Sequence, residues 1–364
     1  MLKMNYSPIF GLMLIFLVGF TTLAQAQTRK YSNEFLSIGV GARALGMSGA
    51  NVASVSDVTA GYWNPANLVD IKADLEIAGM HAEYFAGIAQ FDYGAIAKPI
   101  DSTSVLALSV IRFGVDGIPN TTQLIDADGN LNYDRISTFS AVDYGFMLSY
   151  AKKMKVPGLS IGGNVKVVHR FIGDFAKSWG FGIDLAATYR HNNWRFSAMG
   201  RDLTSTYNAW TYSLDDATKD VFVATGNELP ENGLEITLPK IILGAAYKQE
   251  LNKFALMGEI NAVLSTDGQR NVLISADPVS IEPLLGIEAS YINLIYLRAG
   301  LGNMQRIKTF RGTEEISIQP NLGVGLRLGN FHLDYAITNI GNVSNTLYSN
   351  IFSLKFQVFK APGS

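Results

Sequence analysis

A two-residue alternation of side chains constrains this chain more than any other feature of its sequence. From residue 75 onward, apolar or aromatic residues recur at every second position, with small, polar or charged residues between them. An extended strand points successive side chains to opposite faces, so each such stretch predicts a strand with one apolar face. In the clearest stretch, 178–190, the apolar face carries Trp179, Phe181, Ile183, Leu185, Ala187 and Tyr189.

Fourteen stretches show this alternation, and we predict that each forms a strand. The chain is rich in Gly and poor in charged residues, which make up 16% of it, as is typical of a protein built from many strands and turns. The predicted strands are 75–82, 91–99, 103–114, 143–152, 159–171, 178–190, 194–202, 240–249, 253–263, 283–291, 294–302, 318–328, 331–338 and 350–359.

The connections between these strands differ systematically in length. Those after even-numbered strands are short, with two to six residues each. Short turns on one rim and long loops on the other indicate a 14-stranded antiparallel transmembrane β-barrel of the outer membrane, with both termini in the periplasm. The long connections, which follow most odd-numbered strands, are 115–142, 203–239, 264–282, 303–317 and 339–349.

A soluble β-sandwich or a periplasmic barrel would also alternate, and remains the alternative. Either fold would have to bury most of the large apolar residues, which leaves the charged residues of the opposite face outside. In a membrane barrel that charged face lines the interior instead. It carries Asp184, Glu259, Glu288, Arg298, Arg327 and Asp334.

The N-terminal residues have the pattern of a secretory signal peptide. Lys3 precedes an apolar run at 8–20, and Ala24-Gln25-Ala26 supplies a small-residue cleavage pattern. We therefore expect residues 1–26 to be removed and the mature chain to begin near Gln27. An uncleaved anchor is the alternative, but the apolar run is shorter than a spanning helix requires. The chain contains no Cys, so it has no disulfide framework.

Residues 27–74 lack the alternation and are predicted to form a plug inside the barrel. Dense glycines permit tight backbone turns, and the Asn-Pro step forces an extended or turn conformation. A barrel of fourteen strands, here 75–360 followed by a short tail at 361–364, leaves a lumen that this segment can fill. The residues expected to shape the plug are Gly39, Gly41, Arg43, Gly46, Gly49, Trp63, Asn64, Pro65 and Ala66.

Arg43 is the most informative charged residue of the plug, since no other charge lies between Glu34 and Asp57. A guanidinium inside a barrel requires carboxylate partners. We expect Arg43 either to pin the plug in place or to act as a latch released by a ligand or partner. The candidate partners are Asp184, Glu259, Glu288 and Asp334.

The plug sequence resembles a known family. The stretch 35–50, FLSIGVGARALGMSGA, followed by 61–68, GYWNPANL, is similar to the N-terminal plug of the PorV/PorQ family. These are outer-membrane barrels of Bacteroidota, distantly similar to the FadL fatty-acid transporters, which carry an Asn-Pro-Ala-Gly motif where this chain has Asn67 in the last position.

The resemblance implies a function as well as a fold. PorV-type barrels are components of the type IX secretion system, in which they receive cargo from a large translocon. The resemblance would make this chain a non-catalytic adaptor of an outer-membrane export machine or of the barrel-assembly complex. Its partners would be that machine, cargo proteins and membrane lipid. The alternative is a FadL-like transporter of hydrophobic small molecules.

Both functions would use the longest predicted loops, 203–239 and 115–142. The first contains more apolar residues than a solvent-exposed loop usually holds, which favours contact with a partner or a ligand. The formal net charge of −2 gives no support for nucleic-acid binding. The expected contact residues are Tyr207, Trp210, Tyr212 and Phe222.

Catalysis finds little support in the sequence. The four His residues, at 81, 169, 191 and 332, stand apart from one another and have no Cys beside them. Ser48 lacks the Gly-x-Ser-x-Gly frame of a nucleophile elbow. We therefore expect no enzyme activity and no cofactor.

One stretch has the alternate oxygen side chains of a calcium loop, at Asp126, Asp128 and Asn130. Its Gly is at position 4 instead of 6, and Ser137 stands where the bidentate Glu should be. An Asx-rich surface turn is the favoured interpretation, with calcium as the alternative.

Overall fold

The computed structural model describes residues 32–125, 130–308, 313–338 and 348–360, in which antiparallel strands form a closed barrel. β1 pairs with β16 and closes the wall. The predicted signal peptide lies outside the described residues. The strands are β1 (Leu75–Tyr84), β2 (Ala89–Pro99), β3 (Ser104–Asn120), β4 (Ser137–Lys153), β5 (Leu159–Ile172), β6 (Ala176–His191), β7 (Trp194–Arg201), β8 (Thr206–Tyr212), β9 (Gly233–Thr237), β10 (Lys240–Leu251), β11 (Phe254–Ser265), β12 (Ser280–Tyr291), β13 (Ile295–Lys308), β14 (Glu314–Leu328), β15 (Phe331–Thr338) and β16 (Ser349–Val358).

Two positions in the wall are each built from two strands. β7 and β8 both pair with β6, β7 along 185–191 and β8 along 176–181. β9 in turn pairs with β8, and β10 pairs with β7. Sixteen strands therefore occupy fourteen positions, which confirms the predicted 14-stranded antiparallel barrel.

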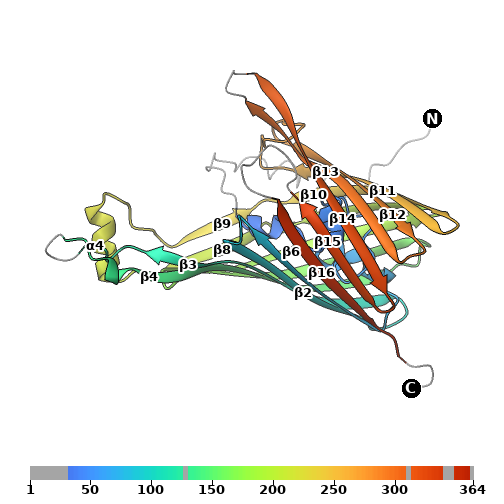
Figure 1. The fold of residues 1–364 in the computed structure, drawn as a ribbon, viewed down its shortest axis with the longest axis horizontal. Helices are drawn as coiled ribbons and strands as arrows, with labels where there is room; N and C mark the ends of the chain where they lie inside the picture. The colour runs from blue at the N-terminus through green and yellow to red at the C-terminus, as the bar shows by residue number, and fades with distance from the viewer. Residues whose placement is uncertain (1–31, 126–129, 309–312, 339–347, 361–364) are drawn as a thin grey trace, which may run out of the picture. The chain divides into compact units, whose positions relative to one another are not determined.

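The strands overlap all fourteen predicted stretches, but two expected loops are partly wrong. The loop 115–142 is shortened because β3 runs to Asn120 and β4 begins at Ser137. The loop 203–239 contains β8, β9 and the helix α4 (Asp216–Ala224). The outer parts of these four strands and α4 form a projection, which we call the arm (Figure 1). A strand outside the membrane does not need an apolar outward face, so the alternation that identifies the other strands fades there.

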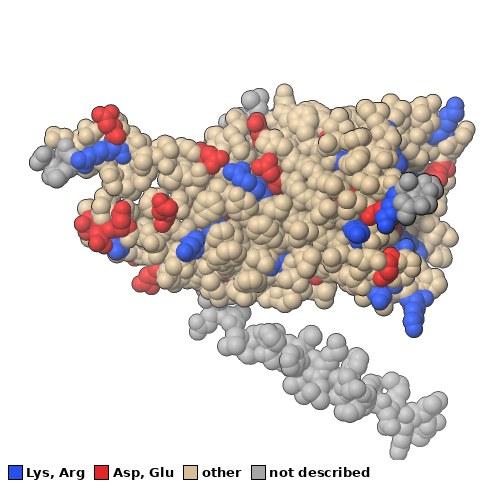
Figure 2. Space-filling model, turned by 90° about the horizontal axis from the view of Figure 1, so that it is seen from below, with Lys and Arg blue, Asp and Glu red and all other residues tan. Residues whose placement is uncertain are grey.

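Apolar side chains face outward around the barrel, and the wall seen in Figure 2 carries few charges between its ends. On β6, Trp179, Phe181 and Leu185 are 45–56% exposed. Trp179 and Tyr189 bound this apolar band and are ten residues apart. At a rise of about 3.3 Å per residue and a tilt of about 40°, they are roughly 25 Å apart along the barrel axis, the thickness of an outer-membrane apolar band.

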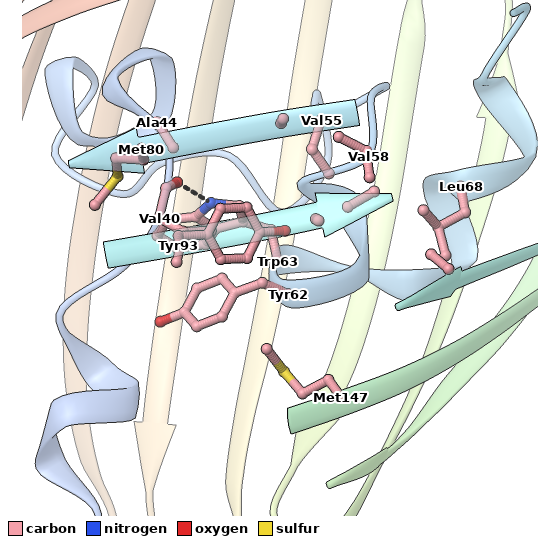
Figure 3. Packing of buried hydrophobic residues seen from close by; sticks show 14 of the residues in the cluster. Val40, Ala44, Val55, Val58, Tyr62, Trp63, Leu68, Met80, Tyr93 and Met147 are labelled. Carbon is pink, nitrogen blue, oxygen red and sulfur yellow. Dashed lines mark hydrogen bonds between the residues drawn. The ribbon is translucent and has the colours of Figure 1, made fainter. Parts of the chain in front are cut away.

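Residues 32–74 fill the interior of the barrel, and we call them the plug. Its short helical segments are η1 (Glu34–Ser37), α2 (Ala42–Gly46), α3 (Ala60–Trp63) and η2 (Pro65–Asp70). Plug residues such as Val40, Val58 and Leu68 are fully buried and form one core with inward residues of the wall, among them Met80 and Met147 (Figure 3). No helix among the described residues is long and apolar enough to cross a membrane.

Glycines of the wall let the plug backbone approach the strands closely. A Cβ added to Gly162 would lie 2.5 Å from the Pro65 carbonyl carbon and from the Ala66 nitrogen. A Cβ added to Gly46 of α2 would lie 3.0 Å from the Cα of Gly323 on β14. The small residues on the inward face therefore fit the backbone of the plug.

Candidate functional site

A cavity of about 390 Å³ lies between the plug and the wall. Tyr84, Arg201, Lys240 and Thr338 contribute to its lining, and each is the first or last residue of its strand. These strand ends lie on the side of the long connections, so the cavity is at that end of the barrel. Its apolar lining consists of Ile38, Leu45, Val52, Trp63, Ile242, Val263 and Leu284.

Trp63 forms part of the cavity lining on the plug side. Its Nε1 donates to the carbonyl oxygen of Val40 at 2.8 Å, which fixes the indole ring (Figure 3). Gly39 has a left-handed φ of 97°, and a Cβ there would lie 3.1 Å from the indole ring. Gly39 therefore adopts a left-handed backbone conformation that other residues rarely adopt, and it leaves room for the indole ring.

Two cations enter the cavity side by side from the wall. Arg201 and Lys240 are direct partners in the ladder between β7 and β10. The Arg201 guanidinium, in a residue only 9% exposed, donates to the Tyr62 carbonyl oxygen at 3.1 Å and stacks over the Tyr62 ring. Lys240 Nζ lies 3.3 Å from the Ser37 hydroxyl oxygen.

Neither of these cations has a carboxylate within 4.0 Å among the described residues. The Glu282 carboxylate also lines the cavity, so the lining carries an excess of positive charge. A buried guanidinium usually has an anionic partner. The cavity can therefore accept an apolar body together with an anionic group.

Arg43 reaches two of its four expected carboxylates, one directly and one through a second arginine. Its Nε lies 2.9 Å from Glu288 Oε2, and Arg298 Nε lies 2.6 Å from that same oxygen. Arg298 Nη1 in turn lies 2.6 Å from Asp334 Oδ1. Burial would lower the pKa of Arg43, but Glu288 raises it above its ordinary value.

The other two candidate carboxylates have different direct partners and form no ion pair with Arg43 within 4.0 Å. Asp184 lies 2.8 Å from Lys166 Nζ. Glu259 accepts hydrogen bonds from the backbone nitrogens of Ala53 at 2.7 Å and Ser54 at 2.9 Å. A carboxylate can hold a plug through backbone N–H groups as well as through an arginine.

Three further ion pairs anchor the plug, and none of them was predicted from the sequence. Asp57 lies 2.7 Å from Lys355 Nζ of β16. Asp70 lies 2.9 Å from Arg190 Nη2 and 3.0 Å from Arg195 Nη1. Asp57 and Asp70 are carboxylates within the plug, and the alternation places Lys355 on the inward face. A search for inward-facing wall residues opposite in charge to the charged residues of the plug would have predicted these ion pairs.

The Asn64-Pro65-Ala66 motif shapes the end of the plug. Asn64 Oδ1 accepts from the Ala66 nitrogen at 3.1 Å, and its Nδ2 donates to the Val52 carbonyl oxygen at 2.8 Å. The same Nδ2 donates to Thr188 Oγ1 at 2.9 Å. The motif therefore joins two parts of the plug to β6.

The expected surface-loop residues lie in regular structure. Tyr207, Trp210 and Tyr212 belong to β8, and Phe222 belongs to α4. Trp210 is 7% exposed and packs under Arg170, so its expected role as an exposed contact is wrong. Tyr207 faces outward, with its ring 6.1 Å from that of Phe181.

The described residues contain no cluster of three or more His, Asp or Glu that could hold a metal ion. Asp126 and Asp128 of the calcium-like stretch lie outside the described residues, so the structure does not test that site. His169 is stacked on Trp179 with ring centroids 4.1 Å apart, and His81 lies on the outward face of β1.

No protein-family model and no curated protein matches the sequence. Solved structures do resemble this one. The toluene transporter TodX of P. putida has a TM-score of 0.55 at 13% identity, covering 89% of this chain and 99% of its own. The toluene transporter TbuX of Ralstonia pickettii has a TM-score of 0.53 at 12% identity, covering 88% and 98%.

A FadL homologue of Pseudomonas aeruginosa has a TM-score of 0.52 at 12% identity, covering 87% of this chain and 97% of its own. At these identities the likeness shows a shared fold. The comparisons add no sequence support for the PorV/PorQ resemblance or for an origin in Bacteroidota. The chain has the closed 14-stranded fold of these FadL-like outer-membrane barrels.

Proposed function

We propose that this barrel carries hydrophobic small molecules across the outer membrane. The observation that carries this proposal is the cavity of about 390 Å³ inside a barrel whose interior is largely filled by the plug. Its volume falls within the range of roughly 300–1,000 Å³ that holds small ligands. The fold shared with toluene transporters supports the same function.

The charges of the lining narrow the class of ligand. Toluene is an uncharged hydrocarbon, whereas Arg201 and Lys240 would attract a negative group. We therefore propose an amphiphile with an apolar body and one anionic group as the preferred ligand. The long-connection end of the barrel would then face the cell surface, with the short turns in the periplasm and no enzymatic step.

Competition binding to the purified protein tests the preference for an anionic group. Decanoate should displace a fluorescent fatty-acid probe at lower concentration than decanol does. Lys240→Met should weaken decanoate binding about tenfold, or about 1.4 kcal/mol, and leave decanol binding unchanged. Lys98→Met, on the outward face of β2, is the matched control. Equal binding of the two ligands by wild type would contradict the proposed anionic ligand.

The arm gives one reason to keep an adaptor of an export or assembly machine as a second candidate. It projects from the barrel and exposes apolar residues such as Val223 and Leu229, which are 65% and 43% exposed. Exposed apolar residues in a group favour contact with another protein. A large partner that co-purifies in equal amount, and is lost when residues 213–232 are replaced by a short turn, would support this role.

A further inference from the structure

An ion-paired cluster lies on the outward face of β1, β2 and β3. His81 Nδ1 is 2.7 Å from Asp92 Oδ1, and Arg112 Nη1 is 3.5 Å from Asp92 Oδ2. Glu83 lies 3.9 Å from His81 Nε2, and Asp116 lies 3.4 Å from Arg112 Nη2. We call these five residues the wall cluster.

Burial along the strands shows that the wall cluster faces away from the plug. The side chains of His81, Glu83, Asp92 and Asp116 are 42–62% exposed. The residues that alternate with them on β1 and β2 are buried inside the barrel: Met80, Ala82, Phe91 and Tyr93.

Apolar residues surround the wall cluster on the same face. Toward the short turns lie Ile77, Ile96 and Leu108, and toward the β1–β2 turn lie Phe85 and Ile88, which are 61% and 65% exposed. Phe352 pairs with His81 on one side, and Tyr144 pairs with Arg112 on the other. The charges, with the polar ladder partners of Glu83, Gln90 and Asn350, are therefore a polar island that runs from the middle of the apolar band toward its outer edge.

The depth of this island makes contact with lipid alone unfavourable. His81 stands six residues after Leu75, the first residue of β1. With a rise of about 3.3 Å per residue and a tilt of about 40°, it lies roughly 15 Å from the start of β1, near the middle of a band of about 25 Å. By the same measure Asp116, twelve residues after Ser104, lies roughly 30 Å from the start of β3, so the wall cluster extends from the middle of the band to its outer edge. Charged residues on the lipid-facing wall of a barrel destabilise it most at the midplane.

We propose that the wall cluster is the docking site for another integral outer-membrane protein, one that presents a Lys or Arg side chain at this depth. The cluster holds three carboxylates against one guanidinium and one imidazole, so its net charge is negative and complements a basic side chain. A second copy of this chain would place excess carboxylates together, and lipid phosphates are themselves negative. The surrounding apolar residues would pack against the apolar wall of that partner. This proposal is independent of the cavity and its ligand.

Single-cysteine reporters can test this directly, because the chain has no Cys. Val110 lies on the outward face of β3, six residues after Ser104 and two residues from Arg112. Ile260 lies at the equivalent place on β11, six residues after Phe254. The two residues are 36% and 53% exposed. A bimane label on Val110→Cys reports on the wall cluster, and the same label on Ile260→Cys is its matched control.

Quenching of the label by a nitroxide-labelled phospholipid measures contact with lipid. In outer membranes of the organism that encodes the protein, quenching should be lost at position 110 and retained at position 260. In liposomes that contain only the purified protein, both positions should be quenched. The double charge reversal Glu83→Lys and Asp116→Lys should restore quenching at position 110 in the native membrane. Both side chains are exposed, and an unchanged heat-dependent mobility on a gel would confirm the fold of the variant.

Three results would overturn the proposal. Equal quenching at both positions in native membranes would mean that lipid covers the wall cluster. Shielding of position 110 in liposomes of the purified protein would mean that a second copy covers it. Shielding that survives the double charge reversal would mean that the carboxylates do not recognise the partner.

Discussion

Gly300 of β13 lies against Met47 of the plug so closely that a Cβ on Gly300 would stand 2.2 Å from the Met47 carbonyl carbon. No side chain can occupy that position unless the plug backbone moves. The wall and the plug therefore fit each other at the level of the backbone, and this fit bounds the cavity between them.

Replacing Gly300 should displace the plug and leave the wall intact. Gly300→Val adds three carbons where none fit, and overpacking of this kind typically costs about 1–3 kcal/mol. We expect faster proteolysis of residues 32–74 in the folded barrel. Gly258→Val is the matched control, because a Cβ there meets nothing within 4 Å. Equal proteolysis of both variants would argue against close packing at Met47.

Arg43→Ala alone should leave the barrel closed. Glu288 keeps Arg298 at 2.6 Å, so the substitution does not leave that carboxylate unpaired. The pairs of Asp57 with Lys355 and of Asp70 with Arg190 also remain. Loss of the Arg43 hydrogen bonds should cost about 2 kcal/mol, too little to release a plug with several anchors. In planar bilayers, wild type and Arg43→Ala should both be silent.

Removing several anchors together should open the pore. We expect channels from a triple variant, Arg43→Ala with Arg190→Ala and Lys355→Ala, and larger channels from a deletion of residues 31–70. A silent deletion variant would be inconsistent with a plug that fills the lumen. Open channels from Arg43→Ala alone would mean that the ion pair between Arg43 and Glu288 is enough by itself to keep the barrel closed.

The contribution of the Asp57–Lys355 pair to closure should be insensitive to pH in the neutral range. Burial would raise the pKa of Asp57, but Lys355 outweighs that effect and holds the pKa well below its ordinary value. An acid with a depressed pKa in the folded state stabilises that state at every pH above its unfolded pKa of about 3.9. The contribution is lost only as the pH falls from there toward the folded pKa.

Bilayer recordings should therefore remain silent from about pH 8 to about pH 5 and open only in stronger acid. Asp57→Asn removes this carboxylate, so its closure should be weaker at neutral pH and should lack the part of the acid response that Asp57 supplies. Opening of wild type near pH 6 would show that a group other than Asp57 controls the plug.

The long-connection end of the barrel should face the cell surface. A short epitope inserted beside Asp216, at the start of α4, should be labelled on intact cells, because the arm projects from that end. The matched insertion beside Asn193, in the short turn after β6, should be labelled only after permeabilisation. The reverse pattern would place the cavity toward the periplasm.

Much of the fold could be predicted because the membrane imposes the alternation. On β6, lipid requires the outward Trp179, Phe181 and Ile183, and the close-fitting interior requires small or polar residues between them. The break in the wall at 202–205 could not be predicted in this way. Asp202 and Ser205 each have a left-handed φ of 57°. Neither is a glycine, the residue type that would have signalled such a turn in the sequence.

Less of the candidate site than of the fold could be predicted from the sequence. Arg43 stands out because its segment is otherwise uncharged, but four inward carboxylates were equally plausible partners until the ladder placed Glu288 beside Arg298. The cavity depends on the pairing of Arg201 with Lys240, which are 39 residues apart in the sequence. Register between distant strands is set by the whole barrel, so no local pattern shows it.

We propose that ligands pass through the cavity between the plug and the wall. Uptake of radiolabelled decanoate by cells that carry the protein tests it, with two neighbouring substitutions on β10. Ile242 lines the cavity and is 5% exposed, whereas Ile241 faces outward and is 43% exposed. Ile242→Trp should narrow the cavity and slow uptake, and Ile241→Trp should transport at the wild-type rate. Wild-type uptake by Ile242→Trp, at equal abundance in the membrane, would mean that ligands do not pass through this cavity.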